Sequence, residues 1–155
     1  MTDERPVSWL TESEMAAWRP YIVGTLKLRQ RLHRELSDQH AVSLVDYEVL
    51  VVLQALGPTR MSELASQMGL TKSRLSHQVA RLEEAELLRR LRDPEDKRGV
   101  VVELAQGGAA LLDKTAPTHL EGVREHLINL LSPEEQAVIA AAFARVEKHL
   151  DGLEG

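Results

Sequence analysis

The feature that most constrains the fold of this chain is a pair of short apolar patterns separated by one glycine, Gly69. The apolar positions on both sides recur at the spacing of amphipathic helices, and they are Leu64, Ala65, Met68, Leu75, Val79 and Leu82. Ser62 and Thr71 are expected to cap the two helices, because a hydroxyl can accept a bond from an unpaired backbone N–H of the first turn. The pattern predicts a helix-turn-helix.

The second predicted helix has a polar face without a single carboxylate between Thr71 and Arg81, in a chain of net charge −5. A solvated helix in such a chain is expected to mix Glu with its Lys and Arg, so that opposite charges pair along the helix. Arg, Ser, Gln and His side chains can instead hydrogen-bond to base edges in the major groove of DNA. A plain solvated face is the competing interpretation. The candidate DNA contacts are Thr71, Lys72, Ser73, Arg74, Ser76, His77, Gln78 and Arg81.

A basic hairpin is predicted to follow this helix. Residues 87–92 and 100–104 suit β-strands, the second because it begins with three valines, and the polar residues 93–99 suit a hairpin tip. A helix-turn-helix followed by a basic hairpin is a winged helix, so Arg92 and Lys97 join the candidate DNA contacts. The basic residues of the hairpin are Arg89, Arg90, Arg92, Lys97 and Arg98.

At this point the chain resembles the MarR family, the multiple-antibiotic-resistance regulators. The resemblance implies that Arg98 enters the minor groove of DNA and that Asp96 helps to hold it. It also implies a regulator, usually a repressor, that binds DNA as a homodimer and takes a small aromatic or phenolic ligand between its arms and its DNA-binding module. The segments that carry the resemblance are Glu63-Leu64-Ala65, Arg81-Leu82-Glu83, the tip from Arg92 to Gly99, and Leu104 with Gly108.

Two positions depart from the family pattern. Glu86 stands where the family commonly has a glycine after the recognition helix, and Ala105 stands where it commonly has a helix-capping threonine. Glycine tolerates the left-handed backbone that often ends a helix, so Glu86 implies either strain or a differently shaped exit. Neither residue is expected to face DNA.

Long helices are predicted on both sides of the winged helix. Thr11 forms a capping box with Glu14 at the start of the first, and Pro20 is expected to bend that helix or to mark its true start. After residues 39–42 as a connector, Ser43 is expected to cap a strongly apolar helix over residues 44–56, which carries the core between the arms and the DNA-binding module. Residues 106–131 predict a long helix kinked at Pro117, and residues 132–135 begin the last helix.

The expected fold is therefore mainly α with a small β-hairpin wing. Residues 1–42 form an N-terminal dimerisation arm, residues 43–104 the winged helix-turn-helix DNA-binding domain, and residues 105–155 the C-terminal dimerisation helices. Charge follows this division, because residues 60–98 hold nine basic and seven acidic residues while both flanks are acidic. Only the middle region can offer a basic surface to DNA.

The apolar residues of the arms predict a homodimer. Trp9, Leu10 and Trp18 lie near one end of the chain, and a stripe that includes Val138 and Phe143 lies near the other. Such surfaces need a partner, and a twofold dimer is the commonest solution. Its two recognition helices could meet successive major grooves of a pseudo-palindromic operator.

Several classes of function are disfavoured. The chain has no cysteine, which excludes disulfides and thiol redox sensing. No run is long and apolar enough to span a membrane and no signal segment is visible, so a cytoplasmic location is expected. We find no hydrolase or phosphate-loop motif, and we expect no enzyme activity, no cofactor and no metal. A zinc site built from His33, His40, His119 or His126 with Asp38 has no recognised spacing.

Four side chains are candidates for the ligand cleft, namely Trp18, Tyr21, His40 and Tyr47. For each of them a place in the core or the dimer interface is the simpler interpretation. Two other functions stay open at this stage. One is a helical dimeric interaction module whose winged helix binds protein without specific DNA binding, and the other is a nonspecific DNA-binding protein.

Overall fold

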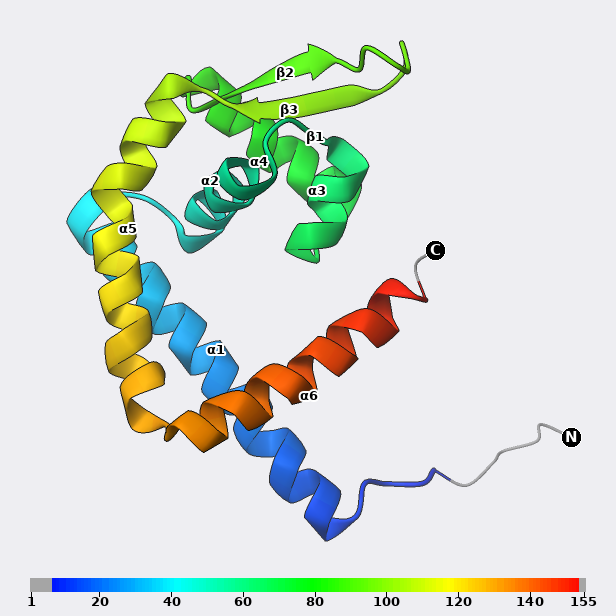
Figure 1. Cartoon of the computed structure of the whole chain (residues 1–155), viewed down its shortest axis with the longest axis vertical. Coiled ribbons are helices and arrows are strands. Elements are labelled where there is room, and N and C mark those ends of the chain that lie inside the picture. The colour runs from blue at the N-terminus through cyan, green and yellow to red at the C-terminus, as the bar shows by residue number, and fades with distance from the viewer. Residues whose placement is uncertain (1–6, 154–155) are drawn as a thin grey trace, which may run out of the picture.

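The computed structural model describes residues 7–153, in which a winged helix sits at one end of a set of long helices (Figure 1). The helices are α1 (Glu12–His40), α2 (Leu44–Leu56), α3 (Met61–Met68), α4 (Lys72–Glu84), α5 (Gln106–His126) and α6 (Pro133–Asp151), with a short 3-10 turn, η1 (Ile128–Leu130). The strands are β1 (Thr59–Arg60), β2 (Leu88–Arg92) and β3 (Val100–Leu104). The expected class, mainly α with a small wing, is confirmed. No helix within residues 7–153 is long and apolar enough to cross a membrane.

Helix α1 begins where its local chemistry predicts. The Thr11 hydroxyl accepts the Glu14 N–H and the Glu14 carboxylate accepts the Thr11 N–H, so the capping box is present. The helix then runs through Pro20, which therefore does not mark its start. It also extends to His40, so the predicted connector shrinks to residues 41–43, with Ala41 in the left-handed conformation at φ 55°.

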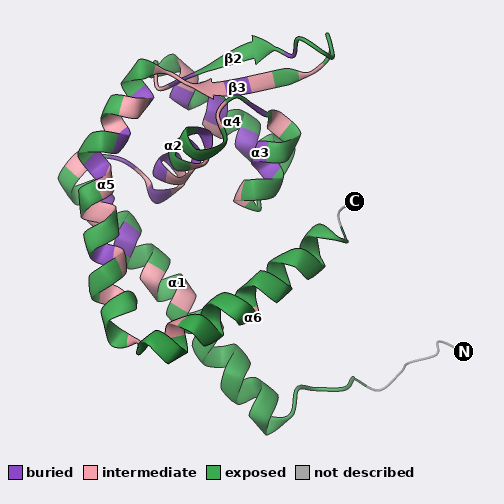
Figure 2. Ribbon diagram, in the orientation of Figure 1, coloured by how far each residue is buried: buried purple, intermediate pink, exposed green. Residues whose placement is uncertain are grey.

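Helix α2 is the centre of the fold, as its apolar sequence predicts. Ser43 caps it by accepting the Asp46 N–H, and Gly57 ends it. One side of α2, including Val49 and Leu53, packs in a core with α3, α4 and the sheet. Its other side, including Leu44, Tyr47 and Leu50, packs in a second core with α1 and α5. The buried residues in Figure 2 lie in these two regions.

The sheet has three antiparallel strands in the order β1-β3-β2, one more than the predicted hairpin. Strand β1 consists of two residues, Thr59 and Arg60, which lie opposite Val102 and Val101 of β3. Strand β1 leads directly into α3, so α3 begins at Met61 with Arg60 before it and no side-chain cap. The prediction that Ser62 caps this helix is wrong, because Ser62 already lies inside the first turn.

The two positions that depart from the family pattern have visible consequences. Glu86, after α4, adopts the left-handed conformation at φ 58°, the one that glycine favours. Ala105 precedes α5 without a side-chain cap, and its backbone N–H bonds to the Leu87 carbonyl oxygen instead. Gly108 packs so closely on the backbone of Leu87 that an added Cβ would collide with the same Leu87 carbonyl oxygen. The exit from α4 and the start of α5 are thus held against each other by backbone contacts.

The C-terminal helices differ slightly from the prediction. Helix α5 passes through Pro117 but stops at His126, and η1 covers three of the five remaining residues of the predicted helix, Ile128–Leu130. Helix α6 begins with the expected capping box of Ser132 and Glu135, with Pro133 at its first position. None of its described residues is buried in this single chain, and it is exposed along its length in Figure 2.

Replacing Glu86 with glycine is expected to stabilise the fold by roughly 0.5–1 kcal/mol, because the steric cost of a left-handed non-glycine residue exceeds the entropy lost by glycine. Urea unfolding at one fixed protein concentration measures this change. Ala80→Gly, at an exposed position inside α4, is the matched control and should destabilise by about 1 kcal/mol. Equal destabilisation by both substitutions would contradict the assignment.

Candidate nucleic-acid interface

The exposed face of α4 follows from the burial of its other face. Leu75, Val79 and Leu82 are buried in the core shared with α2 and α3. The Thr71 hydroxyl accepts the Arg74 N–H and fixes the start of the helix. The side chains that remain exposed at its N-terminal half are those that the sequence proposes as DNA contacts, namely Lys72, Ser73, Arg74, Ser76 and His77.

Gln78 and Arg81 are placed differently from the other candidates on α4. Arg81 Nη2 lies 2.5 Å from Asp46 Oδ1, and the Gln78 amide donates to the same oxygen. Asp46 is only 6% exposed and belongs to α2. These two side chains are therefore bound to the protein itself, a contact that sequence spacing could not show because it joins residues far apart in the chain.

The tip of the wing is a tight loop closed by its own hydrogen bonds. The Asp93 N–H donates to the Gly99 carbonyl oxygen over 3.0 Å, and the Gly99 N–H donates to the Asp96 carbonyl oxygen over 2.8 Å. The Asp96 carboxylate accepts the backbone N–H of Arg98 over 3.0 Å. The family resemblance implies that Asp96 helps to hold Arg98. In the structure, the Asp96 carboxylate contacts Arg98 through this backbone hydrogen bond.

The wing tip is anchored to the body of the domain by Asp93. Its side chain is buried and accepts the Glu95 N–H over 2.9 Å, and Arg60 Nε of β1 lies 2.6 Å from Asp93 Oδ2. The backbone hydrogen bond from Glu95, together with the nearby Arg60 charge, holds the pKa of Asp93 below its ordinary value although burial opposes this. Neither Arg60 nor Asp93 was a predicted site residue.

The basic residues of the hairpin divide into two groups. Arg89 pairs with Glu103 across the sheet at 2.9 Å, and Arg90 pairs with Glu83 at the end of α4 at 2.6 Å. The hydrogen bonds from Arg90 lower the pKa of Glu83, so this pair is charged at neutral pH. Within residues 7–153 no ion pair is found for the second group, and all of its members are exposed: Arg92, Lys97 and Arg98.

A groove of about 420 Å³ brings the two candidate elements together. Lys72 and Ser76 line it from α4, and Asp96 and Arg98 line it from the wing tip. These four predicted DNA contacts therefore share one side of the winged helix, although they come from separate parts of the chain. The remaining lining residues are Arg60, Met61, Ser62, Arg90, Asp93, Gly99 and Val100.

The four predicted ligand residues do not meet in one cleft. Trp18 and Tyr21 lie near the start of α1 with ring centroids 6.0 Å apart, whereas His40 ends the same helix. The rise of an α-helix places Tyr21 and His40 about 28 Å apart along its axis. Tyr47 is only 5% exposed and packs on His119 of α5, with the two ring centroids 4.5 Å apart. Aromatic identity alone did not reveal these separate locations.

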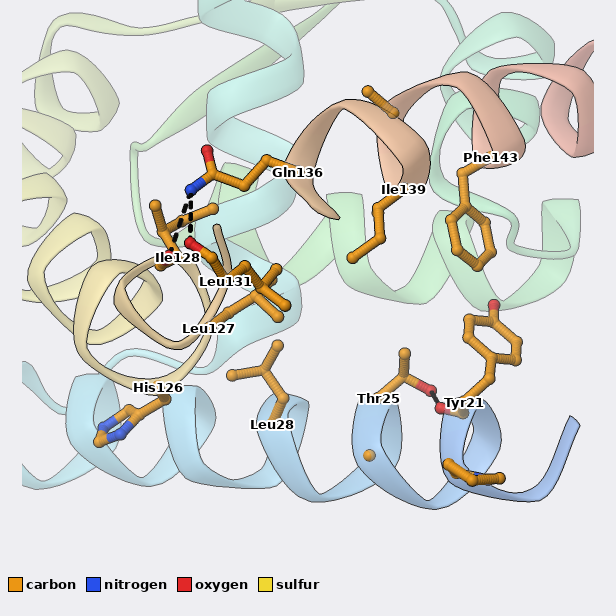
Figure 3. Close-up of a pocket in the computed structure, with 13 residues that line it drawn as sticks. Tyr21, Thr25, Leu28, His126, Leu127, Ile128, Leu131, Gln136, Ile139 and Phe143 are labelled. Atoms are coloured by element: carbon orange, nitrogen blue, oxygen red, sulfur yellow. Dashed lines mark hydrogen bonds between the residues drawn. The ribbon is translucent and has the colours of Figure 1, made fainter. Parts of the chain in front are cut away.

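Tyr21 lines a mainly apolar pocket of about 620 Å³ between α1, α6 and the turn that precedes α6. Figure 3 shows the Tyr21 ring facing Phe143 of α6, and their centroids are 4.9 Å apart. The Gln136 amide donates to the Ile128 and Leu131 carbonyl oxygens at the other end of the pocket. The pocket thus lies within the arms, away from the groove of the winged helix.

The histidines of the arms make contacts within the protein. His33 accepts the Leu44 N–H at 3.2 Å, His40 bonds to Thr118 at 2.8 Å, and His126 bonds to Glu35 at 2.7 Å. Burial lowers the pKa of His119, the histidine that packs on Tyr47. No group of three or more His, Cys, Asp or Glu side chains among the described residues is placed to hold a metal ion.

Comparison with known proteins gives consistent matches to one family. The MarR family profile matches residues 42–100. AbsC, a MarR family transcriptional regulator from Streptomyces coelicolor, is 37% identical with a TM-score of 0.86, and the match covers 94% of this chain and 99% of AbsC. Sco3205 from the same organism, a MarR family regulator solved in complex with DNA, is also 37% identical with a TM-score of 0.86, over 96% of this chain and 93% of Sco3205.

Curated sequences agree. YkoM of Bacillus subtilis, an uncharacterised HTH-type transcriptional regulator, is 31% identical over 76% of this chain and 75% of its own length. PecS of Dickeya dadantii, also an HTH-type transcriptional regulator, is 29% identical over 83% of this chain and 81% of its own length.

The wing anchor should depend on pH in a direction set by Asp93. Because the pKa of Asp93 is lowered in the fold, its charge stabilises the fold at pH values above the unfolded-state pKa of about 3.9, and this stabilisation is lost as the pH falls through the folded-state pKa. Asp93→Asn removes this titration. The difference in unfolding free energy between wild type and Asp93→Asn is expected to be largest above about pH 5 and to shrink towards pH 3. A difference in unfolding free energy that does not change with pH would contradict the role assigned to the Asp93 charge.

Proposed function

The chain belongs to the MarR family of transcriptional regulators, and from that premise we propose that it is a homodimeric repressor that binds a pseudo-palindromic DNA operator. As a member of this family it is a DNA-binding transcriptional regulator. The proposal adds the oligomeric state, the sign of regulation and the residues that contact DNA. The alternative of a protein-interaction module is not favoured, because the relatives are transcriptional regulators and one of them was solved with DNA bound.

The observation that carries the proposal is the groove shared by α4 and the wing tip. An α-helix fits the major groove of B-DNA, where Arg, Ser and His side chains can bond to base edges. With α4 in the major groove of DNA, the wing tip reaches the adjacent minor groove. The negative electrostatic potential of the minor groove attracts the Arg98 side chain. We assign to DNA the exposed candidates Lys72, Ser73, Arg74, Ser76, His77, Arg92, Lys97 and Arg98, with Thr71 as the helix cap and Asp96 as the support of Arg98.

The exposure of α6 supports a homodimer. Val138 is 67% exposed and Leu150 is 51% exposed, and Trp9, before α1, is 82% exposed. Large exposed apolar surfaces of this kind mark interfaces in soluble proteins. A twofold copy that covers the arms would also present a second α4, about 34 Å from the first, to the next turn of DNA. The proposed division into an arm, a DNA-binding domain and C-terminal helices follows from these roles.

An effector ligand, where one exists, acts through the same equilibrium. A ligand releases the repressor only if it binds the DNA-incompetent arrangement of the two α4 helices more tightly than the competent one. Of the four candidate residues, Tyr21 lines the large apolar pocket of the arms, which suits a small aromatic molecule. We further propose a cytoplasmic location and no enzyme activity, as a DNA-binding regulator requires neither export nor catalysis.

The experiment that tests this function is fluorescence anisotropy of the purified protein on labelled duplexes tiled from the DNA upstream of its own gene, with scrambled duplexes as controls. Selective binding of one duplex by two subunits, weakening steeply with salt, is the expected result. Equal weak binding of all duplexes would replace the proposal with nonspecific binding. No binding at low salt would replace it with the protein-interaction module.

Arg74→Ala and Arg98→Ala are each expected to weaken binding of the selected duplex about tenfold or more, since a good side-chain contact to a base contributes about 1–3 kcal/mol. Lys114→Ala, an exposed position on α5, is the matched control and should leave affinity unchanged. Anisotropy titrations at one salt concentration measure all three variants. Unchanged affinity in both arginine variants would show that the assigned DNA contacts are wrong.

Val138→Asp is expected to shift the protein from dimer to monomer and to abolish selective DNA binding, because it places a charge in the proposed interface. The side chain is already exposed in the single chain, so the monomer itself should fold. Sedimentation velocity measures the oligomeric state. Ala144→Asp adds the same charge about 120° around α6 from Val138, outside the apolar stripe, and should remain dimeric. A dimeric Val138→Asp protein would move the interface elsewhere.

A further inference from the structure

Three consecutive residues of α2 each contact a different helix. Asp46 contacts Gln78 and Arg81 of α4, Tyr47 contacts His119 of α5, and Glu48 contacts Arg29 of α1. One turn of α2 is therefore bound to the recognition helix and to both arms. In Figure 1, α2 lies between these elements.

Asp46 is the member of this turn that faces the recognition helix. Its carboxylate is almost fully buried, and a buried carboxylate is costly unless it is paired and hydrogen-bonded. One of its oxygens accepts both the Arg81 guanidinium and the Gln78 amide. It also lies in the first turn of α2, where the helix dipole favours a negative charge. The burial and the two donors make this contact specific in geometry.

The contact constrains how α4 is rotated. Gln78 and Arg81 are three residues apart, so they lie on the same face of the helix. The apolar core holds α4 through Leu75, Val79 and Leu82, but apolar contacts are non-directional and tolerate small rotations. Two hydrogen bonds from one face to a fixed acceptor do not tolerate them. They therefore fix the direction in which Arg74 and Ser76 point.

The acceptor is itself held in place by its neighbours. Glu48 forms a two-point ion pair with Arg29 at 2.6 and 2.9 Å, which raises the pKa of Arg29 through the hydrogen bond to Glu48. Tyr47 is buried against His119, and burial raises the pKa of Tyr47. Both side chains thus join this turn of α2 to the arms.

We propose that Asp46 is a positioning residue for DNA recognition, which orients the recognition helix through Gln78 and Arg81. Under this assignment Gln78 and Arg81 bind Asp46 and do not contact DNA, although their type and spacing on α4 resemble those of DNA contacts. The inference rests on the proposed DNA-binding function. Its rival is that Arg81, whose side chain is 58% exposed, binds a DNA phosphate.

The salt dependence of DNA binding separates the two assignments. Each phosphate contact makes the fall of log affinity with log salt concentration steeper by about 0.9, so losing one in each subunit of a dimer makes it shallower by about 1.8. Arg81→Gln is expected to weaken binding about tenfold with the slope unchanged. Lys72→Gln, at an exposed position on the same helix, is the comparison for a lost charge on the DNA-facing side.

A double-mutant cycle tests whether Asp46 and Arg81 act as a unit. Asp46→Ala is expected to weaken DNA binding about tenfold. The double variant, Asp46→Ala with Arg81→Gln, should have the same affinity as the single variant that binds less tightly. Asp46→Asn, which keeps an oxygen acceptor, should restore most of the affinity. All affinities are expressed per active dimer at 25 °C, so that a loss of folded protein alone does not lower them.

Hydrogen exchange of the free protein provides a readout that needs no DNA. Asp46→Ala is expected to raise the exchange of α4 amides while α3 stays protected, and Glu63→Gln, on the exposed side of α3, is the control. Unchanged α4 exchange, additive effects in the cycle, or a shallower salt dependence of DNA binding in Arg81→Gln would each overturn the inference. If the wild-type protein binds no duplex, the proposed function fails, and the exchange of α4 still decides the role of Asp46.

Discussion

The structure depends on the burial of α2 on two sides. Val49 and Leu53 complete the core of the winged helix, and Leu44 and Leu50 complete the core of the arms. Each core alone is small, and neither closes without this helix. The arms and the DNA-binding module are therefore not joined by a flexible linker, and a change in the angle of the arms moves the helix on which α4 packs. The same apolar surface of α2 therefore stabilises the fold and couples the arms to the DNA-binding module.

A second constraint is that an acidic protein has few basic residues available to bind DNA. Arg60, Arg89 and Arg90 are paired with carboxylates and stabilise the sheet and the wing. Arg74 and Arg98, for which no ion pair is found in residues 7–153, are exposed on the side of α4 and the wing tip. Arginines that pair with carboxylates are thus occupied within the protein, and the others are left to bind DNA. The local charge of the surface, more than the net charge of the protein, determines DNA binding.

Local chemistry made much of the fold predictable. Thr11, Thr71 and Ser132 cap helices where their sequence context predicts, and the two long wing strands lie within one residue of their predicted bounds. Features that depend on distant partners were not predictable. The two residues of β1 have no pattern of their own, and the bond from Arg81 to Asp46 joins separate helices. The exposed face of the candidate site followed from periodicity, whereas the ligand candidates scattered because residue type does not specify location.

The closed loop of the wing tip affects the kinetics of binding. Asp93 and Asp96 accept backbone N–H groups within the loop, so the backbone beside Arg98 is ordered in the free protein. Folding of a loop during an encounter takes nanoseconds to microseconds and costs conformational entropy, whereas an exposed side chain changes rotamer in picoseconds to nanoseconds. Only the Arg98 side chain has to settle after contact. The rate of association with DNA is then set by diffusion, charge steering and the orientation of the dimer.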